Sequence, residues 1–194
     1  MKRREEIIRQ QLLNILQRKF PKLLIIPEAD RWDLVIIGYK RAKAIPIAGI
    51  ELKAQIRKTQ VARVKTWYAH NKSKYRIVQK QKFKIGTVLK VGANIWLAQN
   101  DGGFSQAIRQ YQHSTIKPQK VLILEVDEVN RKFRITDTSK WTKKPYNTGH
   151  TNQVQVIKNG SVYNADIYEP NIQLPIILTF TDYRDIAKAI KKFL

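Results

Sequence analysis

The chain has 194 residues, of which 43% are hydrophobic and 27% charged, a composition typical of a globular protein with its own hydrophobic core. It contains no cysteine, which excludes disulfides and thiolate metal sites and makes a reducing cytoplasm the expected location. No apolar run approaches the ~20 residues of a membrane-spanning helix. The 37 Lys and Arg residues against 15 Asp and Glu residues give a formal charge of +22, so we expect a polyanionic partner, with nucleic acid as the first choice and an anionic membrane surface as the alternative.

The hydrophobic pattern of the first half predicts one helix followed by three strands. Apolar residues recur at helical spacing up to Phe20, and Pro21 ends that run. The polar link Lys40-Arg-Ala-Lys between two β-branched runs favours an antiparallel hairpin. The expected elements are a helix over 3–20, strands over 23–27, 34–39 and 45–56, a basic helix over 59–71, and a short helix or extended segment over 83–91.

The second half alternates strands and helices more loosely. The segment 138–170 mixes aromatic residues with Asn, Thr, Gly and Lys and indicates loops, with one hairpin around Lys158-Asn-Gly-Ser. The motif Thr181-Asp-Tyr-Arg is typical of a helix N-cap. The expected elements are strands over 94–99, 120–126, 132–135 and 174–180, a helix over 105–112, and an amphipathic helix after residue 181.

These elements predict an α/β protein that forms one compact domain. Residues 1–137 would form a core with the N-terminal helix and a basic segment that faces nucleic acid. Residues 138–194 would add a loop-rich elaboration and a closing helix packed on the same unit. Within that part, we interpret 138–170 as an insert for target recognition.

Two acids and one lysine stand at the ends of apolar runs in the first half. Asp33 opens one run, and Glu51 and Lys53 flank Leu52 near the end of the next. Alternate side chains of a strand share a face, so Glu51 and Lys53 should point the same way while Leu52 points into the opposite layer. If the two runs pair, Asp33 lies beside them, and the two carboxylates could hold a divalent cation that activates water for attack on phosphate. The alternative is that Glu51 and Lys53 form a solvated pair at a strand end.

This order of a helix, a strand, a strand preceded by Asp33, a strand with Glu51 and Lys53, and then a helix resembles the core of the PD-(D/E)xK nuclease superfamily. The resemblance covers roughly residues 5–100 and implies a restriction-endonuclease-like core, with a central mixed β-sheet flanked by helices. It also implies that Asp33 and Glu51 bind Mg²⁺, with Mn²⁺ able to substitute, and that Lys53 assists the attacking water or the phosphate. Trp32 precedes Asp33 where the family name has proline.

Further candidates surround these three residues. Glu5 or Glu6 could add a metal ligand from the first helix, although a first-turn glutamate that compensates the helix dipole is the more common case. Gln55 would share the strand face of Lys53 and could contact water or phosphate, or could be a plain polar strand end. Glu28 and Asp30 could join the metal shell or could be surface carboxylates.

Basic residues gather in a stretch that has no acidic residue between Leu52 and Asn100. Such a run predicts contact with phosphates, against the alternative of a solvated basic face. It lacks the wide Leu, Phe and Trp face of a membrane-surface helix, so we expect no membrane partner. The predicted nucleic-acid contacts are Arg57, Lys58, Arg63, Lys65, Lys72, Lys74, Arg76, Lys80, Lys82 and Lys84, together with Lys140, Lys143 and Lys144 of the later insert.

Four aromatic residues lie among these cations, and they could stack on bases or pack inside the protein. They are Trp67, Tyr68, Trp141 and Tyr146, whereas Trp32 and Trp96 lie in strand contexts and are expected in the core.

The function that this pattern favours is a Mg²⁺-dependent DNA endonuclease, preferably a sequence-specific enzyme of the restriction or mobile-element type. Cutting both strands of duplex DNA favours a homodimer with two symmetric sites. One alternative is a structure-specific nuclease that resembles Holliday-junction resolvases or transposon-end nucleases. The other is a nucleic-acid-binding protein of the same fold without catalytic activity.

Overall fold

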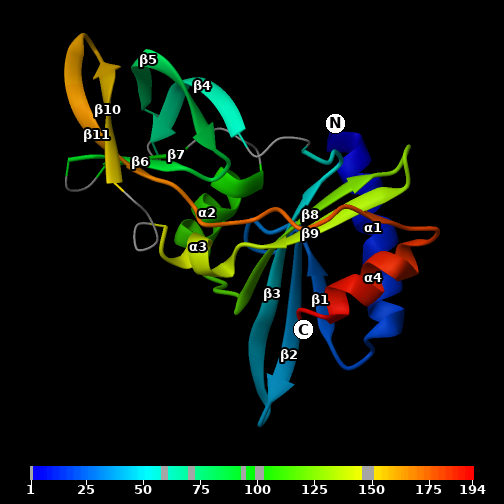
Figure 1. Cartoon of the computed structure of the whole chain (residues 1–194). Coiled ribbons are helices and arrows are strands. Elements are labelled where there is room, and N and C mark those ends of the chain that lie inside the picture. Colours follow the sequence, from blue (N-terminus) through cyan, green and yellow to red (C-terminus); the bar gives the residue numbers. More distant parts are fainter. Residues whose placement is uncertain (1, 58–60, 70–72, 93–94, 99–102, 146–150) are drawn as a thin grey trace. The chain divides into compact units, whose positions relative to one another are not determined.

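The computed structural model describes residues 2–57, 61–69, 73–92, 95–98, 103–145 and 151–194. The chain divides into two compact units (Figure 1). The sheet unit comprises Met1–Arg57, Gln110–Ser139 and Leu174–Leu194, and the barrel unit comprises Lys58–Arg109 and Lys140–Gln173. This division differs from the single compact domain with a boundary after residue 137 that the sequence suggested. The barrel unit combines two segments that are separated in the chain, because the strands of these segments pair with each other and not with strands of the sheet unit.

The sheet unit contains a mixed six-stranded sheet in the order β1-β2-β3-β8-β9-β12. Strands β3 and β8 are parallel, and the other neighbours are antiparallel. Its elements are α1 (Lys2–Lys19), β1 (Leu24–Pro27), β2 (Leu34–Lys40), β3 (Lys43–Lys53), β8 (Lys120–Asp127), β9 (Lys132–Asp137), β12 (Leu178–Thr179) and α4 (Tyr183–Lys191). The α/β class predicted from the sequence is thereby confirmed.

Helices α1 and α4 lie side by side and cover one face of this sheet (Figure 1). Ile8 and Leu12 of α1 and Ile186 of α4 are buried against Ile50 and Leu52 of β3. Removal of this apolar surface from water is the main force that holds the helices on the sheet. Within the described part of the chain, no helix is long and apolar enough to cross a membrane.

The barrel unit contains six antiparallel strands that close in the order β10-β11-β6-β7-β4-β5. Its interior is filled by apolar side chains that include Tyr75, Ile77 and Val156. Helix α2 (Gly103–His113) begins among residues of this unit and ends among residues of the sheet unit. Helix α3 (Ser139–Lys143) begins where the chain returns to the barrel unit, between Ser139 and Lys140. The strands are β4 (Val61–Ala69), β5 (Lys74–Lys84), β6 (Val88–Val91), β7 (Ile95–Ala98), β10 (Thr151–Lys158) and β11 (Ser161–Tyr168).

Both hairpins predicted from short polar links are confirmed. Arg41 and Ala42 between β2 and β3 have φ of 49° and 62°, and Asn159 and Gly160 between β10 and β11 have φ of 50° and 81°. Two successive positive φ angles are typical of the type I′ turn, whose twist matches that of paired strands.

Three predictions for the elements were wrong. The basic helix over 59–71 is strand β4 over Val61–Ala69, because β4 pairs with β5 and β7, and this pairing overrides an ambiguous local pattern. The segment 138–170 is not loop-rich where it is described, since α3, β10 and β11 cover most of it. The strand expected over 174–180 is limited to Leu178–Thr179.

Candidate active site

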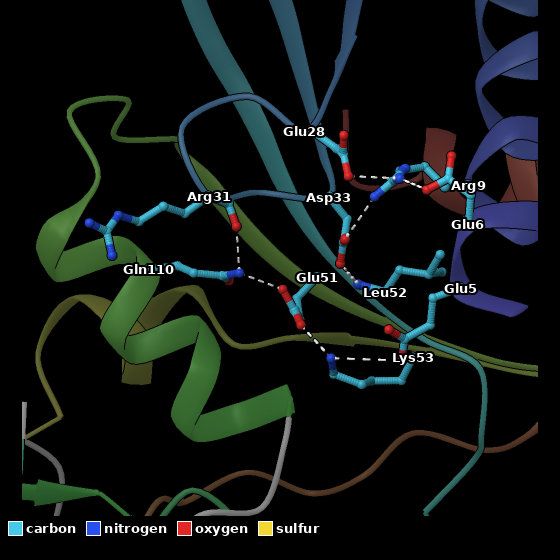
Figure 2. A network of polar contacts seen from close by, with 10 residues as sticks. All are labelled: Glu5, Glu6, Arg9, Glu28, Arg31, Asp33, Glu51, Leu52, Lys53 and Gln110. Atoms are coloured by element: carbon cyan, nitrogen blue, oxygen red, sulfur yellow. Dashed lines mark hydrogen bonds and ion pairs between the residues drawn. The ribbon is translucent and has the colours of Figure 1, made fainter. Parts of the chain in front are cut away.

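Asp33, Glu51 and Lys53 meet at one end of β2 and β3 (Figure 2). The antiparallel register pairs Leu34 with Ile50, so Asp33, which directly precedes β2, lies level with Glu51. The Oδ2 atom of Asp33 accepts a 2.7 Å hydrogen bond from the backbone N–H of Leu52. The Nζ atom of Lys53 lies 2.5 Å from Oε1 of Glu51, while the Leu52 side chain is buried in the opposite layer. The expected placement of the three side chains is therefore what the structure shows.

The three groups differ in their access to solvent. The side chain of Glu51 is fully buried, whereas the side chains of Asp33 and Lys53 are each 23% exposed. Burial raises the pKa of Glu51 to about 7, and the negative charge of Asp33 adds to this effect, while Lys53 and Gln110 oppose it. The protonated and ionised forms of Glu51 therefore coexist near neutral pH.

Lys53 keeps its positive charge in this environment. Burial alone would lower the pKa of its ammonium group, but the adjacent Glu51 carboxylate, assisted by Glu5 and Asp33, raises that pKa above its ordinary value. The resemblance implied that Lys53 assists either the attacking water or the phosphate. The raised pKa favours the second role, in which Lys53 supplies a fixed cation.

Gln110 of α2 holds Glu51 from the side opposite to Lys53 (Figure 2). Its Nε2 atom donates one hydrogen bond of 2.6 Å to Oε2 of Glu51 and another of 2.6 Å to the carbonyl oxygen of Arg31. Gln110 was not predicted from the sequence. The available signal was a lone amide at a buried position of a helix that also buries Ala107 and Ile108.

Arg9 of α1 holds Asp33 from the other side of the site (Figure 2). Its guanidinium contacts Oδ1 of Asp33 at 3.5 Å and Oε1 of Glu28 at 2.8 Å, and it also pairs with Glu6. The Arg9 side chain is only 9% exposed. Arg9 was not predicted from the sequence either, although an arginine beside the buried Ile8 of the same helix was a possible signal.

The loop before Asp33 is held in an uncommon backbone conformation. Glu28, Asp30 and Arg31 all have positive φ, a region that costs non-glycine residues free energy and persists only where surrounding contacts enforce it. The carboxylate of Asp30 accepts hydrogen bonds from the backbone N–H of Ile116 and the hydroxyls of Ser114 and Thr115, which lower the pKa of Asp30 to about 2. Glu28 thus pairs with Arg9, and Asp30 is held by residues 114–116. These contacts hold the backbone of the loop that leads into Asp33.

Gly49 lies two residues before Glu51 on the same face of β3, where Pro118 and Trp32 approach the backbone too closely for a side chain. A Cβ atom at Gly49 would lie 2.8 Å from Pro118 and 2.9 Å from the ring of Trp32. Trp32 is 1% exposed, and its Nε1 donates a 3.2 Å hydrogen bond to Oγ of Ser114. The prediction that Trp32 belongs to the core is confirmed, and its ring closes the face of β3 next to Glu51.

A buried ion pair lies next to Lys53 in the sheet. Glu125 is paired in register with Lys53, and its two carboxylate oxygens accept hydrogen bonds of 2.7 and 3.0 Å from the guanidinium of Arg134. The backbone of Arg57 completes this group, since its N–H donates to Glu125 and its carbonyl accepts from Arg134. This pair was not predicted, although a glutamate inside the apolar strand β8 was a usable signal.

The sequence also assigned a function to Glu5, Gln55 and Trp141. Glu5 forms an ion pair with Lys53, at 4.0 Å from its Nζ atom. Strand β3 ends at Lys53, so Gln55 does not share its face as predicted but lies exposed in a bend. Trp141 is buried, and its Nε1 donates to the carbonyl of Gly86 at 2.9 Å, so it does not present its ring for stacking on bases.

Most predicted cations belong to the barrel unit. Exposed members are Lys74, Arg76, Lys82, Lys84, Lys140, Lys143 and Lys144. The described part of the chain does not include Lys58, Lys72 and Tyr146, nor the side chains of Arg63, Lys65, Trp67, Tyr68, Lys80 and Trp96.

The two carboxylates at this site are the residues that could hold a hard divalent cation. Mg²⁺ is commonly held by one or two carboxylates, with water and substrate phosphate completing its shell. Asp33 and Glu51 supply two carboxylates, and the buried Oε1 of Gln110 receives no hydrogen bond from the described residues. Among those residues, no group of three or more His, Cys, Asp and Glu side chains could hold a metal ion. An ion held by Asp33 and Glu51 would therefore have to take its other ligands from water and substrate.

Comparison with known proteins finds no matching family model, no matching curated protein and no matching solved structure. Any function inferred for the protein therefore depends on the geometry and chemistry of Asp33, Glu51 and Lys53.

Proposed function

We propose that the protein is a Mg²⁺-dependent endonuclease that hydrolyses phosphodiester bonds of DNA. The observation that carries this proposal is the meeting of the Asp33 and Glu51 carboxylates with the Lys53 ammonium at one end of two neighbouring strands. The arrangement of the sheet unit supports a restriction-endonuclease-like core. In it, α1 and β1 precede the two strands that position the acids, and β8 runs parallel to β3.

Each group has a task in phosphodiester hydrolysis. Asp33 and Glu51 would hold Mg²⁺, or Mn²⁺ in its place, and the bound ion would neutralise phosphate charge and lower the pKa of a coordinated water. Lys53 is charged and partly exposed, so its ammonium can be placed against the phosphate that is cut. Asp33 and Lys53 are the solvent-accessible members of the group, so DNA would approach the site from their side.

Arg9 and Gln110 act as positioning residues for the two acids. Arg9 and the N–H of Leu52 hold the two oxygens of Asp33, and Gln110 holds one oxygen of Glu51. Side chains fixed in this way need little reorganisation when substrate binds, which favours catalysis.

The charge of the molecule supports DNA as the substrate. The formal charge of +22 and the exposed cations of the barrel unit suit a long polyanion better than a small substrate. A sequence-specific homodimer remains our preferred form of the enzyme, because two symmetric sites would cut both strands. We place the protein in the cytoplasm on the absence of cysteine.

The burial of Glu51 favours one alternative. A carboxylate that is fully buried, paired with Lys53 and half-protonated near neutral pH could also belong to a DNA-binding protein without activity. The two functions differ in whether a divalent cation enters the site and whether DNA is cut.

Cleavage of supercoiled plasmid in Mg²⁺, Mn²⁺, Ca²⁺ or EDTA separates these functions. We expect cleavage in Mg²⁺ and Mn²⁺ only, and a loss of about 100-fold or more in Glu51→Gln and Asp33→Asn proteins that still bind DNA in Ca²⁺. Asp166→Asn, at a partly exposed acid of β11 whose contact is Gln153, is the matched control and should cut like the parent.

Discrete fragments would support the sequence-specific form, and cleavage of four-way junctions alone would support the structure-specific one. Parental cleavage by Glu51→Gln, or no cleavage of plasmid, junction and linear-end substrates in any metal, would overturn the nuclease proposal.

A further inference from the structure

The outer face of β5 carries a row of cations that the active site does not use. Along β5 the odd-numbered residues Tyr75, Ile77 and Phe83 are buried in the barrel. Lys74 and Arg76 alternate with Tyr75 and Ile77 on one side of a register shift against β4, and Lys82 and Lys84 flank Phe83 on its other side. Both pairs of cations therefore point outward. Lys74, Arg76, Lys82 and Lys84 are all exposed. We name these four residues the β5 stripe.

The surroundings of the β5 stripe are poor in negative charge. The barrel unit has fifteen Lys and Arg residues and three Asp and Glu residues. Lys84 lies 3.7 Å from Glu169, which is one of those three acids. Like charges at alternate positions of one strand repel each other, so the stripe disfavours the folded barrel unless a polyanion offsets the repulsion.

We propose that the β5 stripe binds the phosphate backbone of double-stranded DNA, without regard to base sequence and independently of the catalytic carboxylates. This inference rests on the proposed function, because it takes DNA as the substrate. Lys74 and Arg76 are alternate residues of the strand, as are Lys82 and Lys84, so the members of each pair are roughly 6.7 Å apart. This spacing is about twice the 3.4 Å that DNA rises along its helix axis for each phosphate of one strand. The stripe can therefore follow a backbone with its Lys and Arg side chains.

The side chains of β5 favour duplex over single-stranded DNA. Proteins that bind single strands usually offer exposed aromatic rings on which successive bases stack. The two aromatic residues of β5, Tyr75 and Phe83, are 1% and 2% exposed and point into the barrel. The outward face of β5 thus offers charge for phosphates but no ring for bases.

The test measures binding of a fluorescent duplex of about 25 base pairs to the full chain in EDTA, where no cleavage occurs, over a range of salt concentrations. The stripe variant is Arg76→Gln/Lys82→Gln/Lys84→Gln. The control variant, Lys188→Gln/Lys191→Gln/Lys192→Gln, removes the same charge from exposed positions at α4 and its C-cap. Circular dichroism verifies that both proteins are folded.

The slope of log K against the logarithm of the salt concentration should become less negative by about 0.9 for each lost phosphate contact. We therefore expect a change of about 2 to 3 in this slope for the stripe variant. Two duplexes of unrelated sequence should lose affinity equally, by about tenfold or more at 0.15 M salt. The control variant should stay close to the parent. Equal losses in both variants would overturn the inference, as would a loss confined to single-stranded DNA or to vesicles of anionic lipid.

The two proposals can fail separately. If the stripe variant loses duplex binding but the parent never cuts DNA, the stripe stands and the nuclease proposal fails. If the parent cuts DNA and the stripe variant binds duplex like the parent, the nuclease proposal stands and the stripe fails.

Discussion

Replacing Glu51 by glutamine should change how the stability of the protein depends on pH. Glu51 is fully buried, and its pKa is raised from an ordinary value of 4.5 to about 7 by burial and by the charge of Asp33. The folded protein therefore binds more protons than the unfolded chain between pH 4.5 and about 7. The stability that comes from protonated Glu51 is complete below pH 4.5 and is lost as the pH rises through about 7.

The magnitude follows from the size of this change in pKa. The interval from 4.5 to about 7, at ~1.36 kcal/mol for each pH unit, corresponds to about 3 kcal/mol. Glutamine does not ionise, so Glu51→Gln lacks this loss. The free energy of unfolding of the variant minus that of the parent should therefore increase by about 3 kcal/mol between pH 5 and pH 8.

Urea unfolding in EDTA, followed by tryptophan fluorescence at several pH values, measures this difference without metal. Asp33→Asn provides a second test, because it removes one cause of the raised pKa and should make the pH dependence weaker than in the parent. If parent and Glu51→Gln lose stability in parallel from pH 5 to pH 8, then Glu51 ionises normally and the electrostatic argument is refuted.

Three further predictions concern groups other than Asp33, Glu51 and Lys53. Arg134→Met leaves Glu125 buried without its partner and should lower the free energy of unfolding in urea by about 3–5 kcal/mol. The double variant Arg134→Met/Glu125→Leu should regain most of that stability, and a loss below about 1 kcal/mol in Arg134→Met would contradict a buried pair. Trp141→Phe removes the hydrogen bond to Gly86 and should cost about 1 kcal/mol with unchanged DNA affinity, whereas weaker DNA binding at full stability would indicate a stacking role. Asp182→Ala removes the capping box of α4 and should cost about 1 kcal/mol, and an unchanged midpoint in thermal unfolding would argue against that cap.

Much of the sheet unit could be predicted from local patterns. Helix α1, the strands β1 to β3 and the hairpin at Arg41 and Ala42 follow from hydrophobic periods and turn residues that act over a few positions. The strand period also placed Glu51 and Lys53 on one face, since a two-residue period leaves no other choice once the segment is a strand.

The barrel unit could not be predicted in the same way. The segment that forms β4 has apolar residues at positions compatible with either a helix or a strand, and only its pairing with β5 and β7 selects the strand. Closure of the barrel depends on contacts such as that between Ile77 and Val156, which are distant in the chain and leave no local pattern.

The sequence by itself determined which residues could do chemistry and on which face of β3 Glu51 and Lys53 would lie, because strand periodicity is a local property. Only the tertiary structure decided how those groups behave. The burial of Glu51, its raised pKa, and the contacts of Arg9 and Gln110 with the two acids depend on helices that pack against the sheet from distant parts of the chain. Desolvation and charge–charge interactions depend on distances in space, and no spacing along the chain specifies them.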